Sequence, residues 1–523
     1  MIIYNGFLRL FMEKTSHKIV RNTVFNVFGR GWELLASLLL IPYTISKVGT
    51  EGYGAWVVVG TLTGYLAIMD ISGLGSAFAK YVAEYYAKKE FRKVNQIISL
   101  GFGYYFLFSF FLLFLGVFFQ KEILRLLKFD TAIYTEVSFV IVGILVIGVV
   151  RGSCIVFRSV LLGLQRMDLT NIIAVISSVG TLLGTFLFLK LGYGLRGLVY
   201  NGIVVAVITS SLQVLFAYQA LPELKFRFFP FDKEIFLQSV SYGIKIQFSR
   251  IAELINQGVD KILLGHYLGV VFSGFYEIGA KIANLTTTLP SILLPAIMPA
   301  ASELDALQER GRLKKLYERG TKYLVSLNFP LALFTVITAP LIMFCWLGKP
   351  GYDNSILALQ WLSISYGVYL LTGMGRLVAR GIAILRYEVH ASYLIAAANI
   401  TLSLILILRM GFIGALIGTS LASIIGSTWF LFSFHRYLKE SFFALFKKVY
   451  LVPLFSSVLA SMLIMTTNRL GLGPVTRNDA LGMLLIDVLL FFSLYFILTL
   501  VLNYFDRDDQ ELLTNLRRII RVG

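Results

Sequence analysis

Long apolar stretches alternate with short polar ones along almost the whole chain. A helix of about 20 residues, rising 1.5 Å per residue, crosses the ~30 Å hydrocarbon core of a membrane, and about fourteen stretches are long enough. The first begins near residue 22 and the last ends near residue 501. The pattern therefore predicts an all-α integral membrane protein with about 14 transmembrane helices.

These spans have approximate boundaries, because apolar runs do not fix helix ends to the residue. The expected spans are 22–45, 53–73, 94–119, 136–161, 171–189, 197–218, 236–264, 274–300, 323–347, 356–385, 392–408, 413–434, 449–465 and 481–501. Charged amphipathic helices are expected at 77–91, after the second span, and at 302–322, after the eighth. Prolines at 290, 295 and 299 predict a kink or break within the eighth span.

The sequence pattern of the first span recurs 220 positions later. Phe28-Gly-Arg-Gly-Trp-Glu-Leu34 and Phe248-Ser-Arg-Ile-Ala-Glu-Leu254 share Phe, Arg, Glu and Leu at the same spacing. Gly-x4-Gly-x-Trp, ending at Trp56, likewise matches Gly-x4-Gly-x-Tyr, ending at Tyr276. A Gly-x-x-Gly pair that begins at Gly194 has a counterpart that begins at 411. The protein is therefore predicted to be duplicated.

The duplication predicts two pseudo-symmetric six-helix lobes followed by two additional helices. The expected domains are an N-terminal lobe at 1–220, a C-terminal lobe at 221–440, and two further transmembrane helices with a charged tail at 441–523. Lys and Arg concentrate in alternate loops, which places both termini in the cytoplasm. Met1 to Thr15 lacks a small-residue cleavage site, so no removable signal peptide is expected.

Composition strengthens the membrane assignment. Of 523 residues, 57% are hydrophobic and only 15% charged, and the mean hydropathy is +0.78. The net charge of +18 is what basic cytoplasmic loops produce, so it does not indicate nucleic-acid binding. Cys154 and Cys345 lie in or beside apolar spans and are expected to be core residues. No metal site or cofactor is expected.

Polar residues form a stripe along one face of the first span and of the seventh. Spacings of three and four residues place them on one side of a helix. The residues are Asn26, Arg30, Glu33 and Ser37 in the first span and Gln247, Arg250, Glu253 and Gln257 in the seventh. Charges facing lipid cost ~2.5–3.5 kcal/mol each, so these stripes should face a central cavity. The alternative is that each Arg–Glu pair only holds helices together.

Other charges inside the spans are predominantly basic. Arg151, Arg376 and Arg380 lack an obvious local acid and are candidates for phosphate binding. For Arg380, and for Arg158, the favoured expectation is that the side chain reaches the cytoplasmic membrane surface. Lys281 lies four residues after an acid, which leaves pairing and substrate binding equally open. Arginine's planar fork suits phosphate, so a cavity lined this way suits an anion.

The glycine motifs carry a resemblance to a known family. The run Gly49-x4-Gly54-x-Trp56, followed by Asp70-x-x-Gly-Leu-Gly75 and Tyr81-Val-Ala-Glu84, resembles the start of the polysaccharide-biosynthesis flippases, the Wzx-type translocases of lipid-linked oligosaccharides. Fourteen spans in duplicated halves are similar to the wider superfamily, which also holds multidrug exporters and the lipid II flippase.

This resemblance implies two six-helix lobes around a cavity that opens alternately to the cytoplasm and the exterior, in the inner (cytoplasmic) membrane. The implied substrate is an undecaprenyl-pyrophosphate-linked oligosaccharide, the repeat unit of O-antigen, capsule or exopolysaccharide, and polymerase or export proteins are compatible partners. Arg30 and Arg250 would bind pyrophosphate, Glu33 and Glu253 would balance them, and proton or cation coupling stays open. A multidrug exporter and a lipid II flippase are the alternatives. No cluster of catalytic groups suggests an enzyme.

Overall fold

The structure is a computed structural model of the chain. It describes residues 36, 38–62, 64, 74–129, 133–226, 237, 255–256, 258–291, 294, 297–470, 476–506 and 509. Arg30, Glu33, Arg250, Glu253 and Gln257 therefore lie outside the described residues. Contacts divide the chain into two units, Met1–Gly274 and Phe275–Gly523. The predicted lobe boundary near residue 220 stays a prediction, because most of 227–254 is not described.

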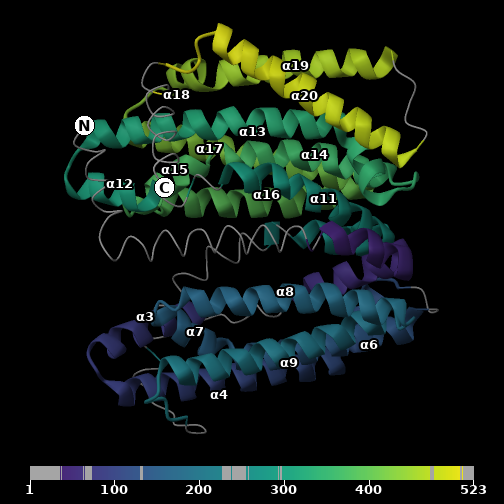
Figure 1. The fold of residues 1–523 in the computed structure, drawn as a ribbon, viewed down its shortest axis with the longest axis vertical. Helices are drawn as coiled ribbons and strands as arrows, with labels where there is room; N and C mark the ends of the chain where they lie inside the picture. The colour runs from purple at the N-terminus through teal and green to yellow at the C-terminus, as the bar shows by residue number, and fades with distance from the viewer. Residues whose placement is uncertain are drawn as a thin grey trace. The chain divides into compact units, whose positions relative to one another are not determined.

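The N-terminal unit is built from long helices that run alongside one another (Figure 1). Helical residues 38–62 precede the named helices, and residues 258–267 follow them. The named helices are α3 (Leu74–Ala87), α4 (Phe91–Phe118), α5 (Gln120–Leu126), α6 (Tyr134–Ser153), α7 (Ile155–Gly163), α8 (Met167–Lys190) and α9 (Gly194–Ala220). Within this unit α6 packs against both α4 and α9, and α8 packs against α9.

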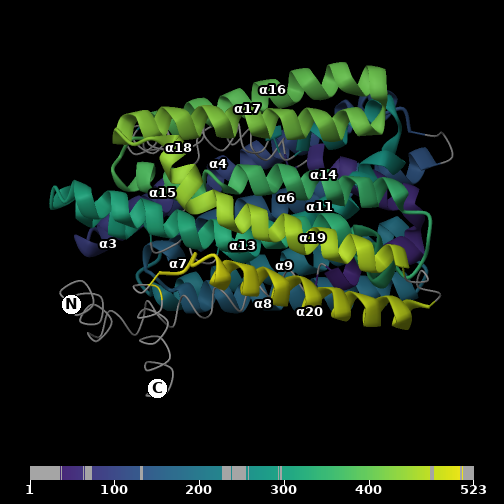
Figure 2. The same ribbon diagram turned by 90° about the horizontal axis from the view of Figure 1, so that it is seen from above.

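The C-terminal unit repeats this arrangement and adds two helices. Its first helix, α11 (Val270–Ser291), begins in the last residues of the N-terminal unit. The elements that follow are α12 (Ile297–Ala306), α13 (Arg310–Leu347), α14 (Asp353–Leu370), α15 (Gly373–Gly381), α16 (Arg386–Met410), α17 (Phe412–Leu438), α18 (Phe442–Leu445), η2 (Phe446–Tyr450), α19 (Leu451–Leu470) and α20 (Arg477–Val501). Figure 2 shows α16 beside α17, and α19 and α20 beside α13, as their contacts require.

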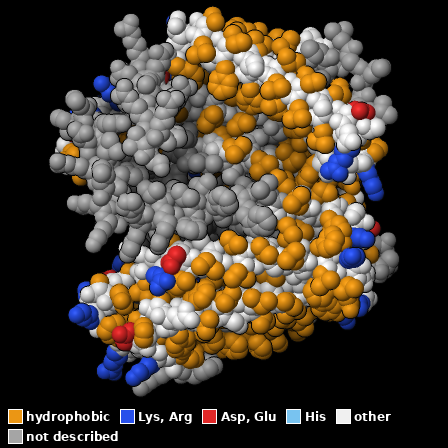
Figure 3. Space-filling model, viewed as in Figure 1, with side chains coloured by type: hydrophobic (Ala, Val, Ile, Leu, Met, Phe, Trp, Pro, Cys, Tyr) orange, Lys and Arg blue, Asp and Glu red, His pale blue; other side chains and the backbone are white. Residues whose placement is uncertain are grey.

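Ten helical spans among the described residues are long and apolar enough to cross a membrane. They match the predicted third to sixth and ninth to fourteenth spans. In the view of Figure 3, hydrophobic side chains cover the length of the helices and most Lys and Arg lie near their ends. The chain is therefore an all-α, multi-pass membrane protein. The first and seventh predicted spans lie largely outside the described residues, the second is described for about half of its length, and the interrupted eighth is not among the ten. The count of fourteen therefore stays a prediction.

In the second half, the break predicted in the eighth span is present, but the charged helix predicted at 302–322 is not a single helix. The eighth span is interrupted as its prolines indicate, since α11 ends one residue after Pro290 and α12 begins at Ile297. The prediction of one charged helix at 302–322 is wrong. That segment is split at Gln308, whose φ of 57° ends α12, and the charged residues from Arg310 onward belong to the same helix as the ninth span.

The same chain reversal appears in both units. After α3, Lys89 has a φ of 59° and is followed by Glu90, whose carboxylate pairs with Lys93 at 2.8 Å. The corresponding turn after α12 places Glu309 before α13, where it pairs with Arg312 at 2.7 Å. These repeated turns agree with the duplication predicted from sequence, whose domain bounds stay a prediction.

Each unit also contains a broken span at the same place. The fourth span consists of α6 and the nine-residue α7, which meet at Cys154. The tenth consists of α14 and the nine-residue α15, which meet at residues 371–372. Both short helices end in a glycine against a neighbouring backbone, because a Cβ on Gly163 or Gly381 would lie 2.7 Å from a carbonyl oxygen of Ala79 or Met298. These contacts hold α7 against α3 and α15 close to the start of α12.

Candidate functional site

A cavity of about 650 Å³ lies within the N-terminal unit. Its walls come from Gly60 and Gly64 and from α4, α6, α7, α8 and α9. The lining residues are Gly60, Gly64, Tyr105, Phe108, Ser109, Leu112, Ile144, Leu145, Ile147, Gly148, Arg151, Gly152, Ile155, Arg158, Thr170, Ile173, Ala174, Ser177, Thr209 and Gln213. Its volume lies in the range of small-molecule sites.

The cavity is basic. Arg151 and Arg158 are its only charged described residues, and neither forms a hydrogen bond or ion pair with another described residue. They are seven residues apart, with Arg151 in the last turn of α6 and Arg158 on α7, and the rise of these helices separates them by about 10 Å. Both side chains are exposed, although Arg151 lies in the interior of the span Tyr134–Gly163. A guanidinium at this depth needs water or an anion, and the described residues supply no carboxylate for either arginine.

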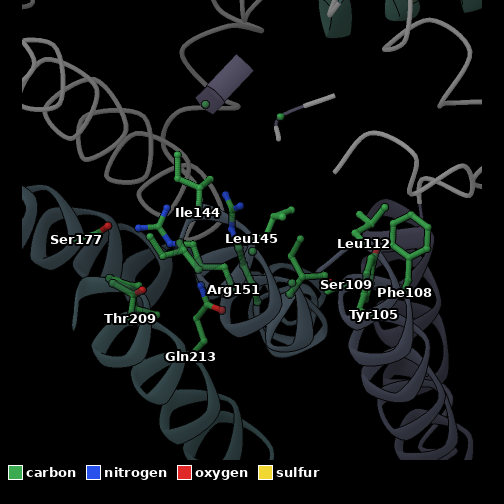
Figure 4. Close-up of a pocket in the computed structure, with 18 of the residues that line it drawn as sticks. Tyr105, Phe108, Ser109, Leu112, Ile144, Leu145, Arg151, Ser177, Thr209 and Gln213 are labelled. Carbon is green, nitrogen blue, oxygen red and sulfur yellow. The ribbon is translucent and has the colours of Figure 1, made fainter. Parts of the chain in front are cut away.

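Uncharged polar groups surround Arg151. Figure 4 shows Ser177, Thr209 and Gln213 near it, and Tyr105, Phe108, Ser109 and Leu112 of α4 in a separate group. The Thr209 hydroxyl donates to the Val205 carbonyl at 2.7 Å, so its oxygen can still accept a hydrogen bond. Hydroxyls and an amide beside two arginines can bind the hydroxyl groups of a sugar next to a phosphate.

Glycines keep the cavity open. A Cβ on Gly60, Gly64 or Gly148 would meet no heavy atom within 4 Å, so these positions border empty space. Gly152, four residues after Gly148 on α6, differs because its Cβ would lie 2.5 Å from the Ser109 hydroxyl oxygen. That contact allows α6 to approach α4 at the cavity wall.

The structure brings together only part of the predicted site. Arg151 lines the cavity, as does Arg158, which sequence reasoning assigned to the membrane surface and therefore missed. The seven-residue spacing to Arg151 is the sequence signal that could have identified Arg158. Lys281 and Arg376 belong to the other unit and do not line this cavity. Their proposed contact with substrate stays a prediction, as do the roles of the five residues that are not described.

Lys281 and Arg376 have partners within their own unit. The Lys281 Nζ lies 3.4 Å from Glu277 Oε1, so the predicted i, i+4 pair forms. Arg376 is buried and contacts hydroxyl groups and aromatic rings. Arg380, which was expected to reach the membrane surface, pairs through two guanidinium nitrogens with the buried carboxylate of Glu388. The described residues contain no group of three or more His, Cys, Asp or Glu side chains that could hold a metal ion.

Comparison with known proteins places this architecture in a family. The profile of the family described as polysaccharide biosynthesis protein matches residues 19–305, which is more than half of the chain. The chain belongs to this family. A putative O-antigen transporter of Shigella flexneri is 21% identical over 354 residues, which cover 66% of this chain and 81% of the relative. A probable low-salt glycan biosynthesis flippase of Haloferax volcanii, Agl15, is 22% identical over 405 residues, covering 76% and 79%.

Solved structures show the same fold. The lipid II flippase MurJ in an inward closed conformation superposes with a TM-score of 0.71 at 17% identity, covering 92% of this chain and 99% of that protein. An inward-facing multidrug resistance MATE family transporter of the MOP superfamily gives a TM-score of 0.62 at 16% identity, covering 77% and 95%. The chain therefore has the transporter fold that its duplicated spans predicted.

Proposed function

We propose that this protein is a flippase that moves a polyprenyl-pyrophosphate-linked oligosaccharide across the cytoplasmic membrane by alternating access. The observation that carries the proposal is the pair of arginines in the cavity, Arg151 and Arg158, which have no partner and no lining acid among the described residues. Family membership and the names of the two relatives support the same cargo class.

The chemistry of the cavity suits the headgroup of such a lipid. Pyrophosphate carries its charge on oxygens that a planar guanidinium can bind in pairs. Ser177, Thr209 and Gln213 offer donors and acceptors for sugar hydroxyls. The apolar tail would remain in the bilayer, where it costs nothing to solvate, so only the headgroup needs a polar path.

The same charges disfavour a multidrug exporter of this fold. An organic cation would be repelled by two arginines and would require an acidic or aromatic site. Lipid II is also a pyrophosphate-linked lipid, so it remains the alternative substrate that the cavity's charge accommodates.

The topology and partners belong to this proposal. Both termini lie in the cytoplasm, the membrane is the inner membrane, and polysaccharide polymerase or export proteins receive the product. The protein performs no bond-making chemistry and needs no resident cofactor. Arg30 and Arg250, with Glu33 and Glu253, would line the central path together with Gln257, and a proton or cation gradient would drive the return step.

The test replaces the two cavity arginines by glutamine, singly and together. A charge-assisted hydrogen bond contributes about 1.5–3 kcal/mol, so each substitution should weaken headgroup binding about 10–150-fold. Surface glycan should fall and lipid-linked oligosaccharide should accumulate inside the cell, with unchanged protein in the membrane. Arg196→Gln is the matched control, because Arg196 lies at the start of α9 over the Phe139 ring, outside the cavity. Normal export by the double variant would refute the assignment.

A further inference from the structure

Arg376 in the C-terminal unit is a buried charge whose surroundings do not satisfy it. Only 6% of the residue is exposed. Its Nε donates to Thr372 Oγ1 at 2.8 Å, and its Nη1 donates to the Tyr369 hydroxyl at 3.1 Å and to Ser392 Oγ at 3.3 Å. The rings of Tyr369 and Phe430 lie 4.5 and 5.5 Å from the guanidinium carbon.

One side of this guanidinium is left without a partner. Nη2 is buried and forms no hydrogen bond in the described structure, and no carboxylate there pairs with Arg376. The nearest acid along α16, Glu388, is already held by Arg380. A buried donor without an acceptor is rare in proteins, and a buried cation without an anion is rarer still. The arrangement therefore lacks an anion on the Nη2 side.

The internal repeat identifies where this site has an open counterpart. Arg158 is the fourth residue of the nine-residue α7, and Arg376 is the fourth residue of the nine-residue α15. Each helix ends in glycine, and the second residue after that glycine, Gln165 or Ala383, has a φ of 57°. Arg158 and Arg376 thus occupy the same position in the two halves, yet Arg158 faces a cavity and Arg376 is enclosed.

The residues that enclose Arg376 also have counterparts in the lining of that cavity. Tyr369 and Arg151 lie equally far before Arg376 and Arg158 in the sequence. Ser392 and Ile173 occupy the same position counted from the start of the next helix, α16 or α8. Phe430 and Gln213 lie equally far after the Gly-x-x-Gly motif of their own half. Two aromatic rings therefore occupy, in the C-terminal unit, the places that a second arginine and a glutamine take in the open cavity.

We propose that Arg376 belongs to a second anion-binding site, which takes a phosphate or pyrophosphate group and is closed in this conformation by Tyr369 and Phe430. The proposal rests on the flippase function, because an anionic headgroup is what both sites would bind. Rotation of either ring away from the guanidinium exposes Nη2, with the Thr372 and Ser392 hydroxyls already beside it. Because the open form is a minor population, the observed affinity is lower than the intrinsic one by that fraction.

The experiment measures binding of radiolabelled inorganic pyrophosphate to the purified full-length chain in lipid nanodiscs. All proteins carry Arg151→Gln and Arg158→Gln, which remove the arginines of the N-terminal cavity. Adding Phe430→Gln copies the residue found at the equivalent open position. We expect this variant to bind pyrophosphate at least about tenfold more tightly than its parent. The reason is that an open form populated below about 10% lowers the observed affinity of the parent by at least that factor, and the substitution removes this reduction.

Three further variants in the Phe430→Gln protein identify the ligating group. Arg376→Gln should abolish the gained affinity. Arg376→Lys, which keeps the positive charge, should reduce it several-fold, because an ammonium lacks the planar fork. Arg409→Gln, which changes an exposed arginine in the last turn of α16, should leave it unchanged. Size-exclusion profiles and pyrophosphate-dependent melting temperatures establish that each variant is folded.

Two results would overturn the proposal. One is a folded Phe430→Gln protein with no gain in pyrophosphate affinity. The other is a gain that persists undiminished when Arg376 is replaced by glutamine. Either would make Arg376 a packing residue, without bearing on the flippase function, which is tested separately by export through Arg151 and Arg158.

Discussion

Filling the cavity at Gly148 should stop transport without unfolding the protein. Gly148 lies on the cavity wall in α6, and a Cβ there meets no heavy atom within 4 Å. A phenylalanine side chain would therefore enter the cavity rather than packed protein. Arg151 lies three residues further along the same helix face, so the ring would cover the guanidinium that we assign to the headgroup.

A second glycine of the same helix, Gly143, provides a comparison for the effect of substitution on the free energy of unfolding. Gly148→Ala replaces a helical glycine without a clash and should raise the free energy of unfolding by about 0.5–1 kcal/mol. Gly143→Ala would place its Cβ 2.1 Å from Val199 Cγ1, and overpacking of this kind costs about 1–3 kcal/mol. The two sites therefore separate loss of cavity from loss of fold.

Thermal melting in detergent and export of surface glycan would be measured on the same variants. Gly148→Phe should melt close to the parent protein and export little. Gly148→Ala should melt at or above the parent temperature and still export, whereas Gly143→Ala should melt lower and lose export only in proportion to folded protein. Normal export by Gly148→Phe would show that the substrate does not pass through this cavity.

Two ion pairs give further predictions. Arg380→Gln leaves the buried Glu388 carboxylate without its partner and should destabilise the protein by about 1–3 kcal/mol, part of which the double change with Glu388→Gln should restore. Asp509→Asn removes a 3% exposed acid from Lys322 and should increase proteolysis after α20, measured by limited digestion. Arg312→Gln, which breaks an exposed pair, should change neither measurement; equal effects would refute both assignments.

The spans were predictable because apolar composition is a strong signal over 20 residues, whereas their interruptions were not. The break between α6 and α7 at Cys154 follows the short polar run Arg151-Gly-Ser153, but the mean hydropathy of the whole stretch Tyr134–Gly163 is high enough for one uninterrupted span. The turns at Lys89 and Gln308 put non-glycine residues at positive φ, where turn propensity favours glycine. The prolines predicted the break after α11, because proline has no backbone N–H to donate and its ring clashes with the preceding turn of a helix.

Register explains why the cavity itself could not be inferred from the repeat. The repeat in the first and seventh spans has an offset of 220 residues, which aligns Arg158 with Val378. An alignment at that offset therefore does not pair Arg158 with Arg376. The short helices α7 and α15 restore the match at an offset of 218, because the loops between the spans differ in length. Even with this match, the open site at Arg158 and the enclosed site at Arg376 differ in the residues that surround the arginine. Aromatic rings fill the space at 369 and 430, whereas Arg151 and Gln213 need water or a ligand beside them. We infer that duplication supplied two equivalent positions and that these neighbouring side chains decide which one is open to substrate in a given conformation.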